Sequence, residues 1–294
     1  MLRKAFWAVA VIVCLIVPVA VQAQGDYLDV YIVKVKPEKM TDFNTLAKKM
    51  VDANRRNNGD NWMALETMYG EGDTIAFIST RQNYADVDKA SGIFMTALNK
   101  AYGKEASEKM LRDWESCLIS SRSELRKRRW DLSRKAPDST SYAKFLGESR
   151  LLRTTAVHVR PGRVADFEAL LRETKTAGEQ NPNTQPVLVS QVIEGGTGTI
   201  FYVSTLRTSL GGFDNNPTIH DILGDEGYKK FLQINAEAVE STQSTLMRFS
   251  PELSNPPTDV LAVAPDFWQP KPTMATRTTK TKTTLEPAAE RTKE

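Results

Sequence analysis

Hydrophobic and polar positions change period in a regular order between residues 31 and 130. β-Branched and aromatic residues from Tyr31 to Val35 predict a β-strand, and apolar residues three and four positions apart from Met40 to Ala53 predict an amphipathic helix. Turn residues between two later alternating segments predict a hairpin. The expected elements are strands at Tyr31–Val35, Trp62–Met68, Thr74–Thr80 and Glu124–Trp130 and helices at Met40–Ala53, Tyr84–Lys100 and Lys104–Ser120. This order, β-α-β-β-α-β, is that of the ferredoxin-like split βαβ unit.

The same succession returns in the second part of the chain. The segment Val33–Phe43, with the pattern V-x-V-x-P-x(5)-F, recurs at Val157–Phe167, an offset of 124 residues, and Thr74-Ile75 recurs at Thr199-Ile200. The period is too long for a solenoid, so we interpret it as two copies of one domain. In the second copy, the late helix is expected at Glu226–Thr242 and the last strand at Thr245–Phe249. The predicted organisation is a signal peptide at 1–23, domains at 24–133 and 151–254, a linker at 134–150 and a disordered tail at 255–294.

The repeated opening motif, the hairpin and the late helix together resemble the dimeric α/β-barrel superfamily, which includes antibiotic-biosynthesis-monooxygenase-like and NIPSNAP-like proteins. The resemblance covers most of residues 27–254. It implies an α+β fold in which two tandem ferredoxin-like βαββαβ domains form a pseudo-dimeric α/β barrel within one chain. This fold carries enzymes as well as proteins without a known activity, so it does not specify a function.

The two ends of the chain predict export and a loose tail. Basic residues followed by an uncharged apolar run and a cleavage site after Ala23 are typical of a secretory signal peptide, with a retained membrane anchor as the alternative. We therefore expect a periplasmic or extracellular protein. Proline, threonine and lysine dominate the tail, which predicts disorder; either it is merely solvated or it makes weak contact with an acidic envelope. The adjacent aromatic residues Phe267 and Trp268 are expected to dock onto a domain.

Composition excludes several classes of function. Lys and Arg number 39 and Asp and Glu 36, so the formal net charge is +3, unlike the strongly basic surface of a nucleic-acid-binding protein. Two His and two Cys are too few for a multi-ligand metal site, and no cofactor is predicted. Cys117 lies among apolar residues at helical spacing, which is typical of a small core residue. No second apolar run is long enough to span a membrane after the leader is removed.

Polar residues at matching strand positions suggest a ligand pocket inside the barrel. Val157 and Val159 alternate with His158, so the valines are expected to face the helices and His158 the interior, with Lys34 as its counterpart in the first copy. In the hairpin strands, Glu66 matches Gln191 and Phe77 matches Tyr202 at an offset of 125 residues. If these faces agree, the pocket residues are Lys34, Trp62, Glu66, His158, Gln191 and Tyr202. Alternatively, His158 is a structural histidine, and Lys34 and Glu66 form an ion pair or face water.

Two further features remain open. His220, expected to open a short helix, is the candidate axial ligand if the protein binds haem, as some relatives of this fold do. Basic residues outnumber acidic ones from Arg122 to Lys135; this segment either recognises an anionic partner or is an edge strand protected by its charges.

The leading functional hypothesis is an exported, non-enzymatic protein that binds a small, partly apolar ligand or a protein partner through the barrel. The sequence offers no acid–base or nucleophile–base pair that can be placed together. The alternatives are a cofactor-free or haem-dependent oxygenase or isomerase, with His158 as the base, and a structural protein of the envelope.

Overall fold

The computed structural model describes residues 24–214 and 216–270 of the 294-residue chain. The predicted signal peptide at 1–23 and residues 271–294 of the predicted tail lie outside these ranges. No helix within them is long and apolar enough to cross a membrane.

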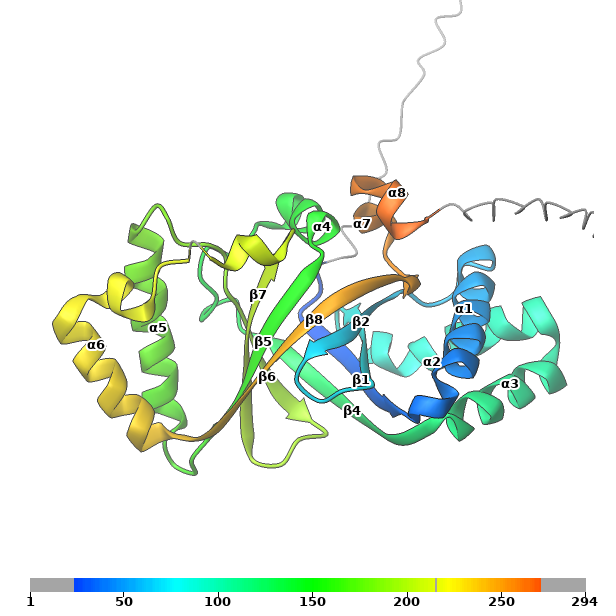
Figure 1. Ribbon diagram of the computed structural model, residues 1–294, viewed down its shortest axis with the longest axis horizontal. Coiled ribbons are helices and arrows are strands. Elements are labelled where there is room, and N and C mark those ends of the chain that lie inside the picture. Colours follow the sequence, from blue (N-terminus) through cyan, green and yellow to red (C-terminus); the bar gives the residue numbers. More distant parts are fainter. Residues whose placement is uncertain (1–23, 215, 271–294) are drawn as a thin grey trace, which may run out of the picture.

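Eight antiparallel strands close into a barrel (Figure 1). The order around the barrel is β1-β3-β2-β8-β5-β7-β6-β4, and β4 pairs again with β1. The predicted α+β class and the barrel are therefore confirmed. The strands are β1 (Tyr27–Val35), β2 (Trp62–Tyr69), β3 (Thr74–Arg81), β4 (Leu118–Arg128), β5 (Leu151–Val159), β6 (Leu188–Glu194), β7 (Thr199–Arg207) and β8 (Val239–Asn255).

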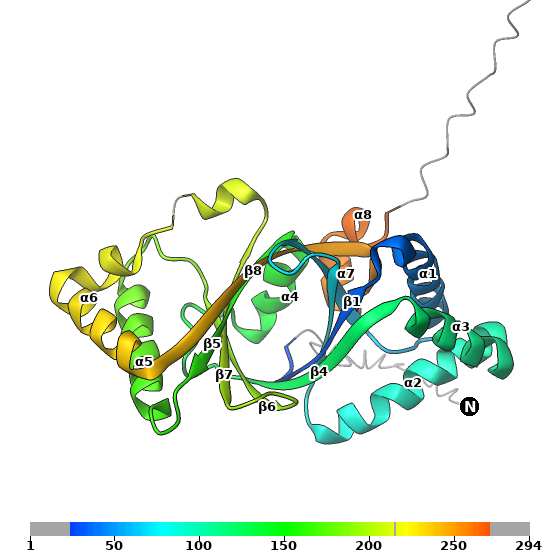
Figure 2. The same cartoon turned by 60° about the horizontal axis from the view of Figure 1, so that its bottom comes forward.

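Each half of the barrel has its own helical cover. The order β4-β1-β3-β2 in the first half equals β8-β5-β7-β6 in the second, and the β2–β8 and β4–β6 pairs join the halves. Both views show α1, α2 and α3 on one side of the barrel and α5 and α6 on the other (Figure 1; Figure 2). These helices are α1 (Met40–Arg56), α2 (Tyr84–Tyr102), α3 (Lys104–Ser116), α5 (Val164–Gln180) and α6 (Ile219–Ala238).

β8 differs from its predicted length because it serves both halves. We expected helix to continue to Thr242 and strand to begin at Thr245, but α6 ends at Ala238 and β8 runs from Val239 to Asn255. The first part of β8 pairs with β5, and the part from Leu246 onward also pairs with β2. These long-range hydrogen bonds, which a local pattern does not reveal, fix the extended conformation.

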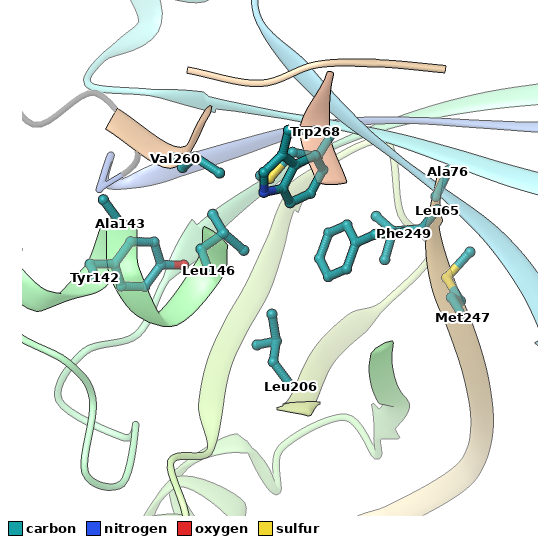
Figure 3. Packing of buried hydrophobic residues seen from close by; sticks show 11 residues of the cluster. Leu65, Ala76, Tyr142, Ala143, Leu146, Leu206, Met247, Phe249, Val260 and Trp268 are labelled. Carbon is teal, nitrogen blue, oxygen red and sulfur yellow. The ribbon is translucent and has the colours of Figure 1, made fainter. Parts of the chain in front are cut away.

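The predicted disordered tail is wrong for residues 255–268, and the predicted linker contains a helix. The segments form α4 (Ser139–Glu148), α7 (Thr258–Val263) and α8 (Pro265–Trp268), which close one end of the barrel (Figure 1; Figure 2). The expected docking of Phe267 and Trp268 is confirmed: Phe267 packs against the cluster of buried residues, and the Trp268 side chain lies within it (Figure 3). Composition missed this because the helices are short and pack on one another and on barrel residues that are distant in the chain.

Candidate functional site

The strand faces divide the predicted pocket residues into two groups. Residues 28, 30 and 32 of β1 and 202, 204 and 206 of β7 line a cavity of about 160 Å³ inside the barrel, which we call the barrel cavity. Of the predicted set, only Tyr202 lines it. Lys34 is on the same face of β1 as Leu28, Val30 and Ile32, although it does not line the cavity. Its Nζ atom lies 2.6 Å from Oε1 of Glu71, which is a lining residue. His158 is on the same face of β5 as the lining residues Thr154 and Ala156, but it lies two residues past Ala156 and does not line the cavity.

The other three predicted pocket residues face away from the barrel interior. The Trp62 indole N–H donates to the Leu253 carbonyl at 2.7 Å, and the ring packs on Phe94 of α2. The Gln191 side chain accepts a hydrogen bond from Arg129 at 2.9 Å. Glu66 is exposed, and Lys34 pairs with Glu71 instead. The Trp62, Glu66 and Gln191 assignments were wrong because side chains of successive strand residues point to opposite faces.

The basic segment of β4 turns its charges into the barrel. Arg122, Arg126 and Arg128 line the barrel cavity at alternate positions. The edge-strand interpretation is wrong, because β4 pairs with β1 on one side and β6 on the other. The alternation of charge was visible in the sequence, but only the closure of the barrel shows that the charged face is the inner one.

Glu124 holds this inner charge cluster together. Its side chain is 5% exposed and accepts hydrogen bonds from Arg126 at 2.7 and 2.8 Å and from Arg122 at 3.1 Å. The Arg126 guanidinium stacks on the Tyr202 ring at 3.4 Å from its centre, and the Tyr202 hydroxyl donates to Glu124 at 3.3 Å. Burial alone would raise the pKa of Glu124, but the charges and hydrogen bonds of Arg126 and Arg122 outweigh it and lower that pKa.

We expect Glu124→Gln to destabilise the protein by about 3 kcal/mol at pH 7, because it leaves buried Arg126 without its partner. A depressed folded-state pKa contributes stability that is present above the unfolded pKa of about 4.3 and is lost as the pH falls through the folded value. The gap between wild type and variant should therefore shrink on acidification, as measured by denaturant unfolding at pH 7 and in acid. The exposed Glu108→Gln change is the control, and a gap that does not change with pH contradicts the assignment.

A larger cavity lies outside the barrel, between the sheet of the second half and its helices. This outer cavity has a volume of about 530 Å³, within the usual range for ligand pockets, and its lining is mostly apolar. Its floor comes from β5, β6 and β7, and its walls from α5, α6 and the segment before α6. Of the α6 residues only Ala238 is buried, whereas α1 buries Phe43, Ala47, Met50, Val51, Ala53 and Asn54. The apolar side of α6 thus borders a void.

The first half fills the corresponding space with aromatic rings. Trp114 of α3 lies 5.9 Å from Tyr31, 5.3 Å from Phe43 and 6.4 Å from Phe77, between ring centres. Strand pairing sets the correspondence: Val33 faces Ile75 as Val157 faces Phe201, so Phe77 matches Val203.

The same counting shows how the outer cavity arises. Tyr31 corresponds to Thr155, and Phe43 to Phe167, which is kept. Leu118 pairs with Val35 as Val239 pairs with Val159, so Leu118 and Val239, the first residues of β4 and β8, correspond. Counting back from them, Trp114 corresponds to Asn235, and the buried Cys117 corresponds to the buried Ala238. Smaller side chains thus replace three aromatic residues, and all three replacements, Thr155, Val203 and Asn235, line the outer cavity.

The residues around the outer cavity do not fit axial ligation of haem. The described residues that line it include no His, Cys, Met or Tyr, which are the usual axial ligands. His220 at the start of α6 is exposed and bonds to Asp225 through Nε2–Oδ1 at 2.7 Å, and it is not a lining residue. Among the described residues, no group of three or more His, Cys, Asp or Glu could hold a metal ion.

No family model matches the chain, and no curated protein matches it in sequence. Three solved structures show partial likeness. A monooxygenase-like protein of Lactobacillus acidophilus NCFM is 12% identical, with 77% of this chain and 94% of that chain covered and a TM-score of 0.46. An anthrone oxidase-like protein is 15% identical, with 78% and 93% covered and a TM-score of 0.47. A mutant chlorite dismutase of Candidatus Nitrospira defluvii is 11% identical, with 81% and 95% covered and a TM-score of 0.44.

Proposed function

We propose that this protein binds a small, mostly apolar molecule in the outer cavity. The carrying observation is the replacement of Tyr31, Phe77 and Trp114 by smaller counterparts in the second half, which leaves about 530 Å³ unfilled. Apolar side chains that border a cavity lack packing partners on that side, and a ligand that fills the cavity supplies these contacts. In the first half, the rings of Tyr31, Phe77 and Trp114 pack together at the corresponding place, so the fold itself does not require the cavity.

Binding without catalysis is the form of this function that the lining supports. Within the part of the chain that the structure describes, no Asp, Glu, His or Cys lines the outer cavity. General acid–base chemistry at neutral pH depends chiefly on such groups, and nucleophilic catalysis needs an activated nucleophile beside a base. The role of His158 as a base has no support here, because it lines neither cavity.

We also infer that the two halves are tandem copies of one ferredoxin-like unit, with the second specialised for binding. The identical strand order in both halves and the matching strand registers support this. Export to the periplasm or the cell exterior is part of the proposal and rests on the leader sequence alone. The proposed contact of the basic tail with an acidic envelope, or binding of a protein partner, stays a prediction.

Titration of the purified protein with the neutral dye phenylnaphthylamine tests the proposal. We expect saturable fluorescence enhancement at one site per chain with a Kd in the micromolar range, roughly 1 to 10 µM. Native mass spectrometry of freshly purified protein should show whether a small molecule is already bound. A linear, non-saturating signal at a temperature where the protein is folded, together with a ligand-free mass, would contradict the proposal.

A further inference from the structure

A buried arginine of the first half shows how this fold normally neutralises the charge at the end of β3. Arg81 is held by Asp60, with both guanidinium–carboxylate distances at 2.7 Å, and by Asp29 at 3.2 and 3.3 Å. Burial would lower the pKa of Arg81, but the hydrogen bonds and charges of Asp60 and Asp29 outweigh it and raise that pKa. The cation is therefore fully balanced within the protein.

The second half keeps this arginine and loses both carboxylates. Arg207 faces Leu151 across β5 as Arg81 faces Tyr27 across β1, so the two arginines hold matching places. In the same register Asp29 corresponds to Arg153. Asp60, two residues before Trp62, corresponds to Gln185, two residues before Val187. One acid has become a base and the other a neutral amide.

Arg207 now bonds only to neutral oxygens. Its guanidinium donates to the carbonyls of Gly212 at 2.9 Å and Leu206 at 2.6 Å and to the Asn216 side chain at 2.8 Å. Burial lowers the pKa of Arg207, and the positive charges of Arg153 and Arg134 lower it further. These three cations therefore lie close together and form no ion pair with a described carboxylate, although the charge of Glu179 partly offsets that of Arg134.

The third cation, Arg134, is fixed against the cavity wall. Its backbone bridges to Val187 in both directions at 2.9 Å, and its side chain crosses Gly178 of α5, where a Cβ atom would come within 2.2 Å of it. Its Nε atom is buried without a hydrogen-bond partner. Within the described ranges, no ion pair joins Arg134, Arg153 or Arg207 to a carboxylate, and all three line the outer cavity.

We propose that the ligand of the outer cavity is an amphipathic anion, whose carboxylate, sulfonate or phosphate group is bound by Arg207, Arg153 and Arg134 while its apolar body fills the space left by the missing rings. This inference rests on the proposed function. Arg207 is buried, Arg134 is half-buried and Arg153 is exposed. A desolvated guanidinium such as that of Arg207 is costly without an anion, and guanidinium groups bind planar or tetrahedral anions through charge-assisted hydrogen bonds. In the first half, Asp29 and Asp60 play the part that the ligand's anionic group plays in the second.

Two dyes with the same ring system test this inference separately from the cavity itself. Phenylnaphthylamine is neutral, and anilinonaphthalene sulfonate adds one sulfonate to the same rings. We expect the wild-type protein to bind the sulfonate at least about tenfold more tightly than the neutral dye at low salt. High salt should weaken the sulfonate and leave the neutral dye nearly unchanged.

Arg153→Asp restores the first-half arrangement and is the decisive variant. It places a carboxylate beside Arg207, as Asp29 stands beside Arg81, so sulfonate binding should fall by about tenfold or more while neutral-dye binding stays within about twofold. Arg160→Asp, the same charge change at an exposed residue outside the lining, is the matched control and should leave the dye ratio unchanged. Neutral-dye binding with no sulfonate preference, or with a preference that Arg153→Asp leaves intact, overturns the inference and leaves the proposed function standing. Failure of both dyes overturns both.

Discussion

Replacing Val203 by Phe and Asn235 by Trp is expected to abolish binding of phenylnaphthylamine, with a loss of affinity of about 100-fold or more. These changes restore in the second half the rings that Phe77 and Trp114 contribute to the first. Val203 lies at the centre of the cavity floor, because it pairs with Thr155 on one side and Val189 on the other, and both line the cavity. The measurement is the same fluorescence titration.

The refilled variant should also be more stable than the ligand-free wild type, by about 1 to 3 kcal/mol in denaturant unfolding, because the new rings bury apolar surface in existing space. The reciprocal change in the first half, Phe77→Val with Trp114→Asn, is the control and should destabilise the protein without removing the binding site. Retention of dye binding by a folded Val203→Phe, Asn235→Trp variant would place the dye elsewhere and contradict the proposed site.

Trp268→Ala is expected to lower the free energy of unfolding by about 3 to 5 kcal/mol. Its side chain is 0% exposed, its ring lies 5.5 Å from that of Phe249, and its indole N–H donates to the Gly147 carbonyl at 3.0 Å. The substitution leaves a cavity between α4, α7 and the barrel end (Figure 3). Denaturant unfolding followed by circular dichroism gives the value.

Two comparison variants separate packing from the hydrogen bond at this position. Trp268→Phe keeps most of the packing and loses the bond to Gly147, so a smaller loss of about 1 to 2 kcal/mol is expected. Tyr69→Ala at an exposed position should change stability little. A loss below about 1 kcal/mol for Trp268→Ala would mean that the C-terminal helices are not part of the cooperative fold.

The comparison of the two parts of the sequence predicted the order of strands and helices along the chain. It aligned β3 with β7 one residue out of register, and this error affected the predicted site. The offset of 124 between β1 and β5 holds, so Val33 and Val157 both pack under helices as expected. The predicted offset of 125 at the next hairpin strand is wrong, because Phe77 matches Val203 and not Tyr202. A slip of one residue moves a strand residue from the inner to the outer face, so Phe77 and Tyr202 were compared although they lie on opposite sides of the sheet.

The outer cavity can be predicted from the sequence only if the strands and helices of the two halves are aligned in the correct register. Once Tyr31, Phe77 and Trp114 are set against Thr155, Val203 and Asn235, the loss of ring volume is plain from the residues. The same holds for Asp29 and Arg153. Hydrophobic periodicity specifies which face a residue occupies within its own segment, but it does not specify which residue of another segment lies opposite.

The sequence by itself indicated the order of the eight strands and of the helices that cover the barrel, and the apolar faces that form the core, because these depend on contacts close along the chain. Only the tertiary structure decided that the β4 charges point into a closed barrel, that α4, α7 and α8 close one end of it, and that the second half is hollow where the first is filled. Those features depend on pairings between residues far apart in the chain, such as Trp62 with Asn255 and Arg248 with Leu151. The cavities and the inward-facing charges form only when segments distant in the chain pack together, so the sequence of one segment does not reveal them.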